Sequence, residues 1–161
     1  MIRAADKKDF TFIYSLYMHP EINPYLLYEV MDATAFQPEF DALLARDILY
    51  VYEGDDGQAA GMFKFIPYTH RSDHVAYVGG LAIAPDRQGK GYGLRMMREI
   101  IELGNALHIL RIELSTAVNN EKAIGLYERA GFQKEGVLRK YTHLKKENIF
   151  LDEVLMAYIY P

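Results

Sequence analysis

The residues with the clearest chemical potential form one glycine-rich segment, Arg87-Gln88-Gly89-Lys90-Gly91-Tyr92-Gly93. An apolar strand pattern precedes it at residues 77–83, and a helical pattern follows it from Leu94. Glycines let a backbone turn tightly and let a ligand come close, because they have no Cβ. The N–H groups at the start of a helix attract anions. The segment therefore predicts a loop that binds a phosphate group.

Three kinds of phosphate ligand compete for this loop. A P-loop requires Ser or Thr directly after the lysine, but Gly91 follows Lys90, which excludes nucleoside triphosphate hydrolysis. A dinucleotide fingerprint requires Gly-x-Gly-x-x-Gly, but the third glycine comes one residue early, at Gly93, which disfavours this alternative. The third ligand is an acyl-CoA, whose pattern Gln/Arg-x-x-Gly-x-Gly/Ala is fitted by Gln88, Gly91 and Gly93.

Two later motifs support the acyl-CoA interpretation. They are Asn120-x-x-Ala123 and Leu126-Tyr127-Glu128-x-x-Gly131-Phe132. With all three motifs in this order, the chain resembles the GNAT superfamily of N-acetyltransferases from about Ile48 to its end. A weaker likeness, in His19-Pro20-Glu21, Leu151-Asp152 and Met156-Ala157, is to the branch that acetylates amino acids and similar small amines. The resemblance implies direct transfer of an acetyl group from acetyl-CoA, as co-substrate, to a primary amine.

The resemblance also implies which residues hold the cofactor. The pyrophosphate would lie on backbone N–H groups of the glycine-rich loop, the pantetheine arm would follow the preceding strand, and Asn120 would bind that arm. The cofactor-binding set is then Leu81, Ala82, Ile83, Gln88, Gly89, Lys90, Gly91, Tyr92, Gly93 and Asn120. Gly79-Gly80 would form a bulge that separates this strand from residues 109–116. Each feature also has a purely structural explanation, such as a plain helix cap for Asn120.

Tyr127 is the catalytic candidate, because a phenol can protonate the departing CoA thiolate. A tyrosine on the apolar side of a short helix can equally be a core residue. On the acceptor side the candidates are Tyr25, Tyr28 and Glu29, with Tyr17 beside them, although this tyrosine cluster can also be core. Removal of the amine proton needs a base or a water chain, and Glu29, Tyr77, His74 and Glu113 are candidates without a supporting motif.

The surrounding pattern predicts an α/β fold of α+β type. Helices are expected at residues 6–18, from Asp32 or Thr34 to Arg46, and at 94–107 and 121–130. Strands are expected at residues 2–4, 48–53, 59–67, 75–83, 109–116, 132–141 and 149–160. Consecutive hairpins followed by one βαβ crossing give a GNAT-like, mostly antiparallel sheet of about seven strands flanked by about four helices.

Length and composition limit the possible domain organisation, location, partners and metal chemistry of the protein. The length of 161 residues predicts a single acetyltransferase domain, residues 1–161, and the net charge of −4 argues against nucleic acid as a partner. No apolar run could span a membrane and the N-terminus has no signal-peptide core, so we expect a cytoplasmic protein. There is no cysteine and the histidines are scattered, so we expect neither a metal site nor a cysteine nucleophile.

Partners and substrate stay open at this point. The apolar residues 154–159 of the last strand could pair with a second subunit, which predicts a homodimer. The acceptor could be an amino acid, a polyamine, an aminoglycoside-like drug or a protein N-terminus. A non-catalytic acyl-CoA-binding module is the alternative from another class of function.

Overall fold

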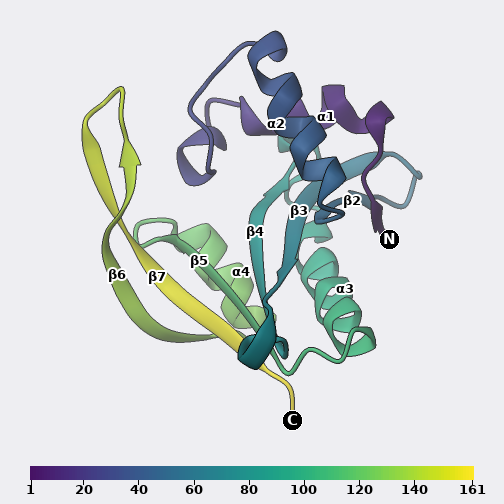
Figure 1. Ribbon diagram of the computed structural model, residues 1–161, viewed down its shortest axis with the longest axis vertical. Helices are drawn as coiled ribbons and strands as arrows, with labels where there is room; N and C mark the ends of the chain where they lie inside the picture. Colours follow the sequence, from purple (N-terminus) through teal and green to yellow (C-terminus); the bar gives the residue numbers. More distant parts are fainter.

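The computed structural model describes residues 1–161, which form a seven-stranded sheet in the order β1-β2-β3-β4-β5-β7-β6 (Figure 1). Only β4 and β5 run parallel, and α3 connects them. The strands are β1 (Ile2–Ala4), β2 (Leu49–Glu53), β3 (Ala59–Pro67), β4 (Val75–Ile83), β5 (Arg111–Ala117), β6 (Gln133–Leu144) and β7 (Ile149–Ile159). The helices are α1 (Phe10–Tyr17), α2 (Ala33–Ala45), α3 (Tyr92–Ala106) and α4 (Glu121–Arg129). The predicted mixed fold is confirmed.

Local capping chemistry explains where the helices begin. The Asp6 carboxylate accepts from the Lys8 N–H, and the Asp9 carboxylate reaches back to the Asp6 N–H, so a capping box opens a 3-10 turn that leads into α1. Asp32 and Asn120 cap α2 and α4 through their side chains. Helix α3 begins at Tyr92, earlier than the predicted Leu94, because Gly91 takes a left-handed φ of 77° and turns the chain directly into the helix.

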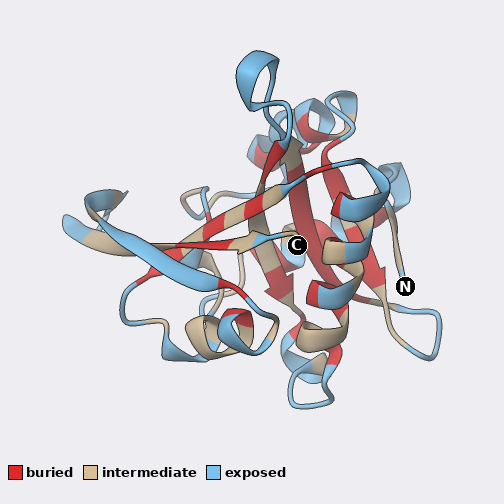
Figure 2. Ribbon diagram, turned by 90° about the horizontal axis from the view of Figure 1, so that it is seen from below, coloured by how far each residue is buried: buried red, intermediate tan, exposed pale blue.

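Each face of the sheet has its own hydrophobic core. One core lies between α1, α2 and strands β2 to β4 and is built around Phe36, Phe40 and Tyr17. The other lies under α3 and α4 and includes Phe63, Met96 and Tyr127. Figure 2 shows the buried residues concentrated in the central strands and in the inner faces of the helices. The two cores therefore fix the central strands from both sides.

The β6–β7 hairpin projects from this body (Figures 1 and 2), and most of β6 is exposed. Strand β7 lies inside the sheet, between β5 and β6, and is hydrogen-bonded on both edges. The prediction that this last strand offers its edge to a second subunit is therefore wrong. The free edges of the sheet belong to β1 and β6, and a homodimer stays a prediction without that basis.

Candidate active site

A gap opens between β4 and β5, the two parallel strands at the centre of the sheet. Their pairing runs through three residue pairs and ends at Tyr77 and Glu113. Beyond it the register of β4 against β3 shifts between Met62 and Lys64, where Gly80 has a φ of 58°. The predicted bulge at Gly79-Gly80 is thus confirmed. It turns β4 away from β5, so the second half of β4 faces the gap with an unpaired edge.

The glycine-rich loop lies at the end of this half of β4 and presents unused hydrogen-bond donors. No backbone N–H from Gly89 to Leu94 has an acceptor within the protein. Helix α3 has no side-chain cap, and an added Cβ at Gly89 or Gly91 would meet nothing within 4 Å. A pyrophosphate would satisfy these donors and gain from the helix dipole, so the loop fits the phosphates of CoA.

Ion pairs and hydrogen bonds brace the loop from both sides. Arg87 pairs with Asp56 at 2.6 Å, and Arg95 pairs with Asp55 at 2.7 Å, both on the β2–β3 turn. The Gln88 amide donates to the Ile83 carbonyl at 3.1 Å and accepts from the Lys122 ammonium of α4 at 2.6 Å. The side chain of Gln88 therefore ties β4 to α4 at the mouth of the gap.

The remaining residues predicted to bind the cofactor differ in how they are placed. Ala82 and Ile83 pair with β3, which leaves their other edge toward the gap, and Leu81 packs against the core under α3. Asn120 caps α4, and its amide also donates to the Thr116 hydroxyl at 3.1 Å, so it is less free than the sequence suggested. The Lys90 ammonium donates to the Asp86 carbonyl at 3.0 Å, and Tyr92 is buried beneath the loop.

Tyr127 lies on the α4 side of the gap and is 6 % exposed. Burial raises the pKa of its phenol, and the nearby Tyr77 and Glu153 raise it further. The phenol is therefore fully protonated at neutral pH and can donate a proton or a hydrogen bond. Its ring also packs against Phe132, with 6.3 Å between the ring centroids, so Tyr127 has a core contact as well.

A chain of polar groups crosses the gap on the opposite face of the sheet. The Tyr77 hydroxyl lies 3.2 Å from the Ser115 Oγ, and Ser115 donates to the Glu153 carboxylate. Thr142 donates to the other oxygen of Glu153 at 2.8 Å. Ser115, Thr142 and Glu153 were missed from the sequence. The available signal was a pair of adjacent acidic residues, Asp152 and Glu153, within the otherwise apolar strand β7.

The other candidate bases are placed less favourably than Tyr77. Glu113 pairs with Arg111 at 2.9 Å and accepts from the Tyr68 hydroxyl at 2.8 Å. His74 is exposed at the beginning of β4, at the end away from the bulge. Of these residues only Tyr77 belongs to the polar chain across the gap, and burial raises the pKa of its phenol.

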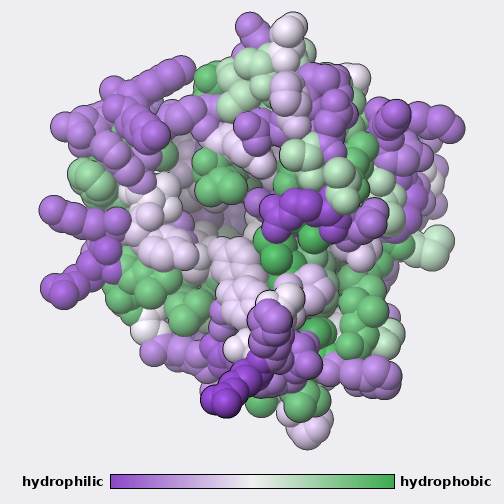
Figure 3. Space-filling model, in the orientation of Figure 1, coloured by the Kyte–Doolittle hydropathy of each residue, from purple (hydrophilic) through white to green (hydrophobic).

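Figure 3 shows a hollow between the α1–α2 connection and the β6–β7 hairpin. The predicted acceptor residues belong to that connection. Tyr28 packs edge-on against Tyr17, with 5.1 Å between ring centroids, and Tyr25 is 46 % exposed. The Glu29 carboxylate accepts from the Lys145 N–H at 2.9 Å. Glu29 thus joins the α1–α2 connection to the β6–β7 turn.

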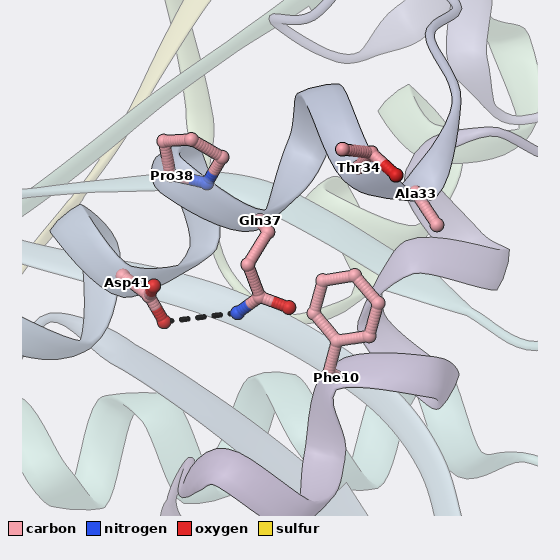
Figure 4. Close-up of a pocket in the computed structure, with 6 residues that line it drawn as sticks. All are labelled: Phe10, Ala33, Thr34, Gln37, Pro38 and Asp41. Carbon is pink, nitrogen blue, oxygen red and sulfur yellow. Dashed lines mark hydrogen bonds between the residues drawn. The ribbon is translucent and has the colours of Figure 1, made fainter.

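A second depression lies outside this site (Figure 4). It is bordered by Phe10 and by one side of α2, where the Gln37 amide donates to Asp41 at 3.0 Å. No residue of the gap reaches it. No group of three or more His, Cys, Asp or Glu is placed to hold a metal ion, and no helix is long and apolar enough to cross a membrane.

Comparison with known proteins agrees with this geometry. The profile of the acetyltransferase (GNAT) family matches residues 10–132. Spermidine N(1)-acetyltransferase of Vibrio cholerae is 30% identical over 146 residues, covering 85% of this chain and 80% of that protein. L-amino acid N-acetyltransferase AaaT of Escherichia coli is 28% identical over 166 residues, covering 98% of this chain and 96% of that protein.

Comparison of the fold with solved structures identifies the same family. The crystal structure of the Vibrio cholerae spermidine N-acetyltransferase in complex with CoA and spermine superposes with a TM-score of 0.84. It is 25% identical, and the match covers 99% of this chain and 94% of that one. A strand bulge, a splayed parallel pair and a donor-rich loop thus coincide with a family profile over most of the chain. The chain belongs to the acetyltransferase (GNAT) family and is an N-acetyltransferase.

Proposed function

We propose that the enzyme transfers an acetyl group from acetyl-CoA directly to a primary amine of a small molecule. The observation that carries this proposal is the gap between β4 and β5, which has Tyr127 on one side and the Tyr77–Ser115–Glu153 chain on the other. A proton donor and a proton acceptor on opposite sides of one opening match the two proton transfers of acetyl transfer to an ammonium.

Acetyl-CoA would supply the activated acyl thioester. The N–H groups from Gly89 to Leu94 would hold its pyrophosphate, and the free edge of Leu81, Ala82 and Ile83 would pair with its arm. Asn120 would add a hydrogen bond from the other wall. The Tyr127 phenol, protonated at neutral pH, would donate to the sulfur as the thiolate leaves.

The amine side uses a different set of groups. A primary ammonium has an ordinary pKa of about 10.4, so it must lose a proton before it can attack. Tyr77 and Ser115 would orient the amine and pass this proton to Glu153, the carboxylate at the end of the chain. No cysteine is present, so a thiol on the protein takes no part in the transfer.

The contact between Glu29 and Lys145 favours a small acceptor. It bridges the α1–α2 connection and the β6–β7 turn, which border the hollow. Tyr25 and Tyr28 would then line the entrance for a small molecule. A folded protein presenting its N-terminus would need this bridge to open. The relatives named for spermidine and L-amino acids also support a small amine.

The test is an acceptor screen that measures release of the CoA thiol with a thiol reagent. Because the protein has no cysteine, it adds no background to this assay. The panel contains L-amino acids, spermidine, an aminoglycoside and peptides with free N-termini. We expect turnover with a small amine and none with the peptides. Calorimetry with CoA runs in parallel.

Two results would contradict the proposal. Turnover of peptides alone would move the acceptor to a protein N-terminus. Tight CoA binding without turnover of any amine would favour a non-catalytic acyl-CoA-binding module.

A further inference from the structure

Lys64 is a buried cation without a counter-charge. It lies on β3 directly opposite Gly79 of the bulge and is 7 % exposed. None of the ion pairs in the structure includes it. The charged side chain that acts on it is Arg46, another cation. Burial without a partner lowers the pKa of the Lys64 ammonium.

Tyr17 carries a second unsatisfied donor at the same place. Its hydroxyl is the only fully buried side-chain polar atom without a hydrogen-bond partner in the structure. A Cβ added at Gly80 would lie 2.7 Å from this hydroxyl and 3.2 Å from the Lys64 Cε. The two groups therefore converge on the bulge from α1 and β3. The Tyr28 ring lies beside them, 6.0 Å from the Lys64 Nζ.

The same spot adjoins the polar chain across the gap. A Cβ added at Gly79 would lie 2.9 Å from the Tyr77 Cε1 and 3.7 Å from the Lys64 Cε. The Tyr77 ring leads on to Ser115 and Glu153. The bulge therefore has a cationic group on one side and, beyond Tyr77, a carboxylate on the other. The absence of a Cβ at Gly79 and Gly80 lets Tyr17, Lys64 and Tyr77 approach its backbone this closely.

A buried ammonium and a buried hydroxyl are both costly when they lack acceptors. An ammonium has only donors, so one acceptor group with negative charge would satisfy both Lys64 and Tyr17. A carboxylate has this chemistry, because each of its two oxygens can accept a hydrogen bond from one of the two donors. A polyamine would instead bring a second cation toward Lys64, where like charges repel.

We propose that Lys64 and Tyr17 bind the carboxylate of the acceptor, so that the substrate is an amino acid rather than a polyamine. This inference rests on the proposed transfer to a small amine. The acceptor lies across the bulge with its carboxylate on Lys64 and its amino group toward Tyr77 and Ser115. Lys64 is a specificity residue, because it selects which amines lie at the thioester.

The kinetic test compares each L-amino acid with its own carboxamide, with spermidine as a third acceptor. For the wild type we expect a kcat/KM for the acid that exceeds that of the amide by about 10- to 100-fold, the value of a hydrogen bond to a charged group. Lys64→Met should abolish this preference by raising the KM of the acid while leaving the amide unchanged. Lys64→Arg should retain part of the preference for the acid. Tyr17→Phe should reduce this preference less than Lys64→Met does.

A binding test makes the inference independent of turnover. With CoA bound, the wild type should bind the L-amino acid more tightly than its carboxamide in calorimetry. Lys64→Met should raise the Tm of the free protein, because it removes an unpaired buried charge, but should lose the Tm increase caused by the amino acid. Lys8→Met removes an exposed lysine and is the control, with unchanged preference and unchanged Tm increase.

The outcomes separate this inference from the proposed function. Equal kcat/KM for acid and amide, or an acid preference that survives in Lys64→Met, overturns the role of Lys64. Efficient turnover of spermidine without turnover of amino acids overturns the amino-acid assignment and leaves transfer to a small amine intact. Absence of turnover with every amine contradicts the proposed function, and the binding comparison then still decides whether Lys64 recognises a carboxylate.

Discussion

The Tyr77 hydroxyl lies 3.2 Å from the Ser115 Oγ, just beyond the last residue pair that joins β4 to β5. The main-chain ladder between the two strands ends, and a side-chain hydrogen bond takes over across the widening gap. Ser115 in turn donates a hydrogen bond to Glu153 on β7. The gap that would admit the cofactor arm between β4 and β5 is therefore still bridged by side-chain hydrogen bonds at its narrow end.

Replacement of Glu153 tests the proton path of the acceptor amine. Glu153→Gln keeps an oxygen that can accept from Ser115 but removes the carboxylate that receives the proton. We expect kcat/KM for the amine to fall by about 100-fold, while CoA affinity stays unchanged. Steady-state kinetics and calorimetry measure the two quantities.

Glu135→Gln is the control for the loss of one negative charge. Glu135 is an exposed carboxylate on β6 that pairs with Arg111, and it takes no part in the gap. A Glu153→Gln enzyme as active as Glu135→Gln would remove Glu153 from the proton path.

Replacement of Tyr127 tests the proton donor for the leaving thiolate. Burial holds the phenol protonated, so Tyr127→Phe removes the donor without changing charge. We expect kcat to fall by about 100-fold and the Kd for CoA to change little. Tyr158→Phe is the matched control, because Tyr158 packs on the same Phe132 ring at 5.8 Å. Equal kcat values for the two variants would argue that Tyr127 serves the core alone.

Replacement of Gly91 tests where the pyrophosphate binds. Gly91 has a φ of 77°, and a valine there would strain the backbone and place methyl groups over the N–H donors. Gly91→Val should abolish measurable CoA binding. Gly57→Val is the control, since Gly57 has a φ of 71° in equally open space on the β2–β3 turn. Both variants should lose stability by about 1–3 kcal/mol, the usual cost of such strain. Retained CoA binding by Gly91→Val would place the pyrophosphate elsewhere.

Local signals in the sequence were sufficient to predict the helices and strands and the glycine-rich loop with its free N–H donors. The caps Asp6, Asp32 and Asn120 act within three residues of the N–H groups that they satisfy, so spacing alone identifies them. The bulge was predictable because paired glycines in a strand have few other uses. Strand alternation, however, does not say which neighbour a strand takes. The prediction that β7 offers its edge to a second subunit was wrong, because β7 lies between β5 and β6 in the sheet.

The acceptor side could not be predicted from local patterns, because sheet topology brings its groups together from distant parts of the chain. Tyr77 and Ser115 are 38 positions apart, as are Ser115 and Glu153. Glu29 and Lys145 are 116 positions apart. Lys64 in the sequence looks like any strand lysine, and only its burial beside the bulge distinguishes it.

The last prediction concerns acid stability and a buried carboxylate far from the gap. The Asp9 carboxylate accepts hydrogen bonds from the two terminal guanidinium nitrogens of Arg3, at 2.8 and 2.9 Å. It also accepts from the Asp6 N–H at 2.8 Å. Burial opposes ionisation of Asp9, but these hydrogen bonds outweigh it, so the pKa of Asp9 lies below its ordinary value of 3.8. Its contribution to stability is therefore fully present above about pH 4 and is lost as the pH falls through the lower, folded-state pKa.

Asp9→Asn should accordingly lower the free energy of unfolding at pH 7 by about 2 kcal/mol, the worth of a hydrogen bond between charged groups. In a protein of this size that corresponds to a Tm lower by about 4–8 °C. The difference from wild type should shrink in acid, because the wild-type carboxylate becomes protonated there. Urea denaturation at neutral pH and at about pH 3 measures it, with the exposed Asp73→Asn as control. A difference that is constant or grows in acid would mean that the Arg3 pairing does not lower the pKa of Asp9.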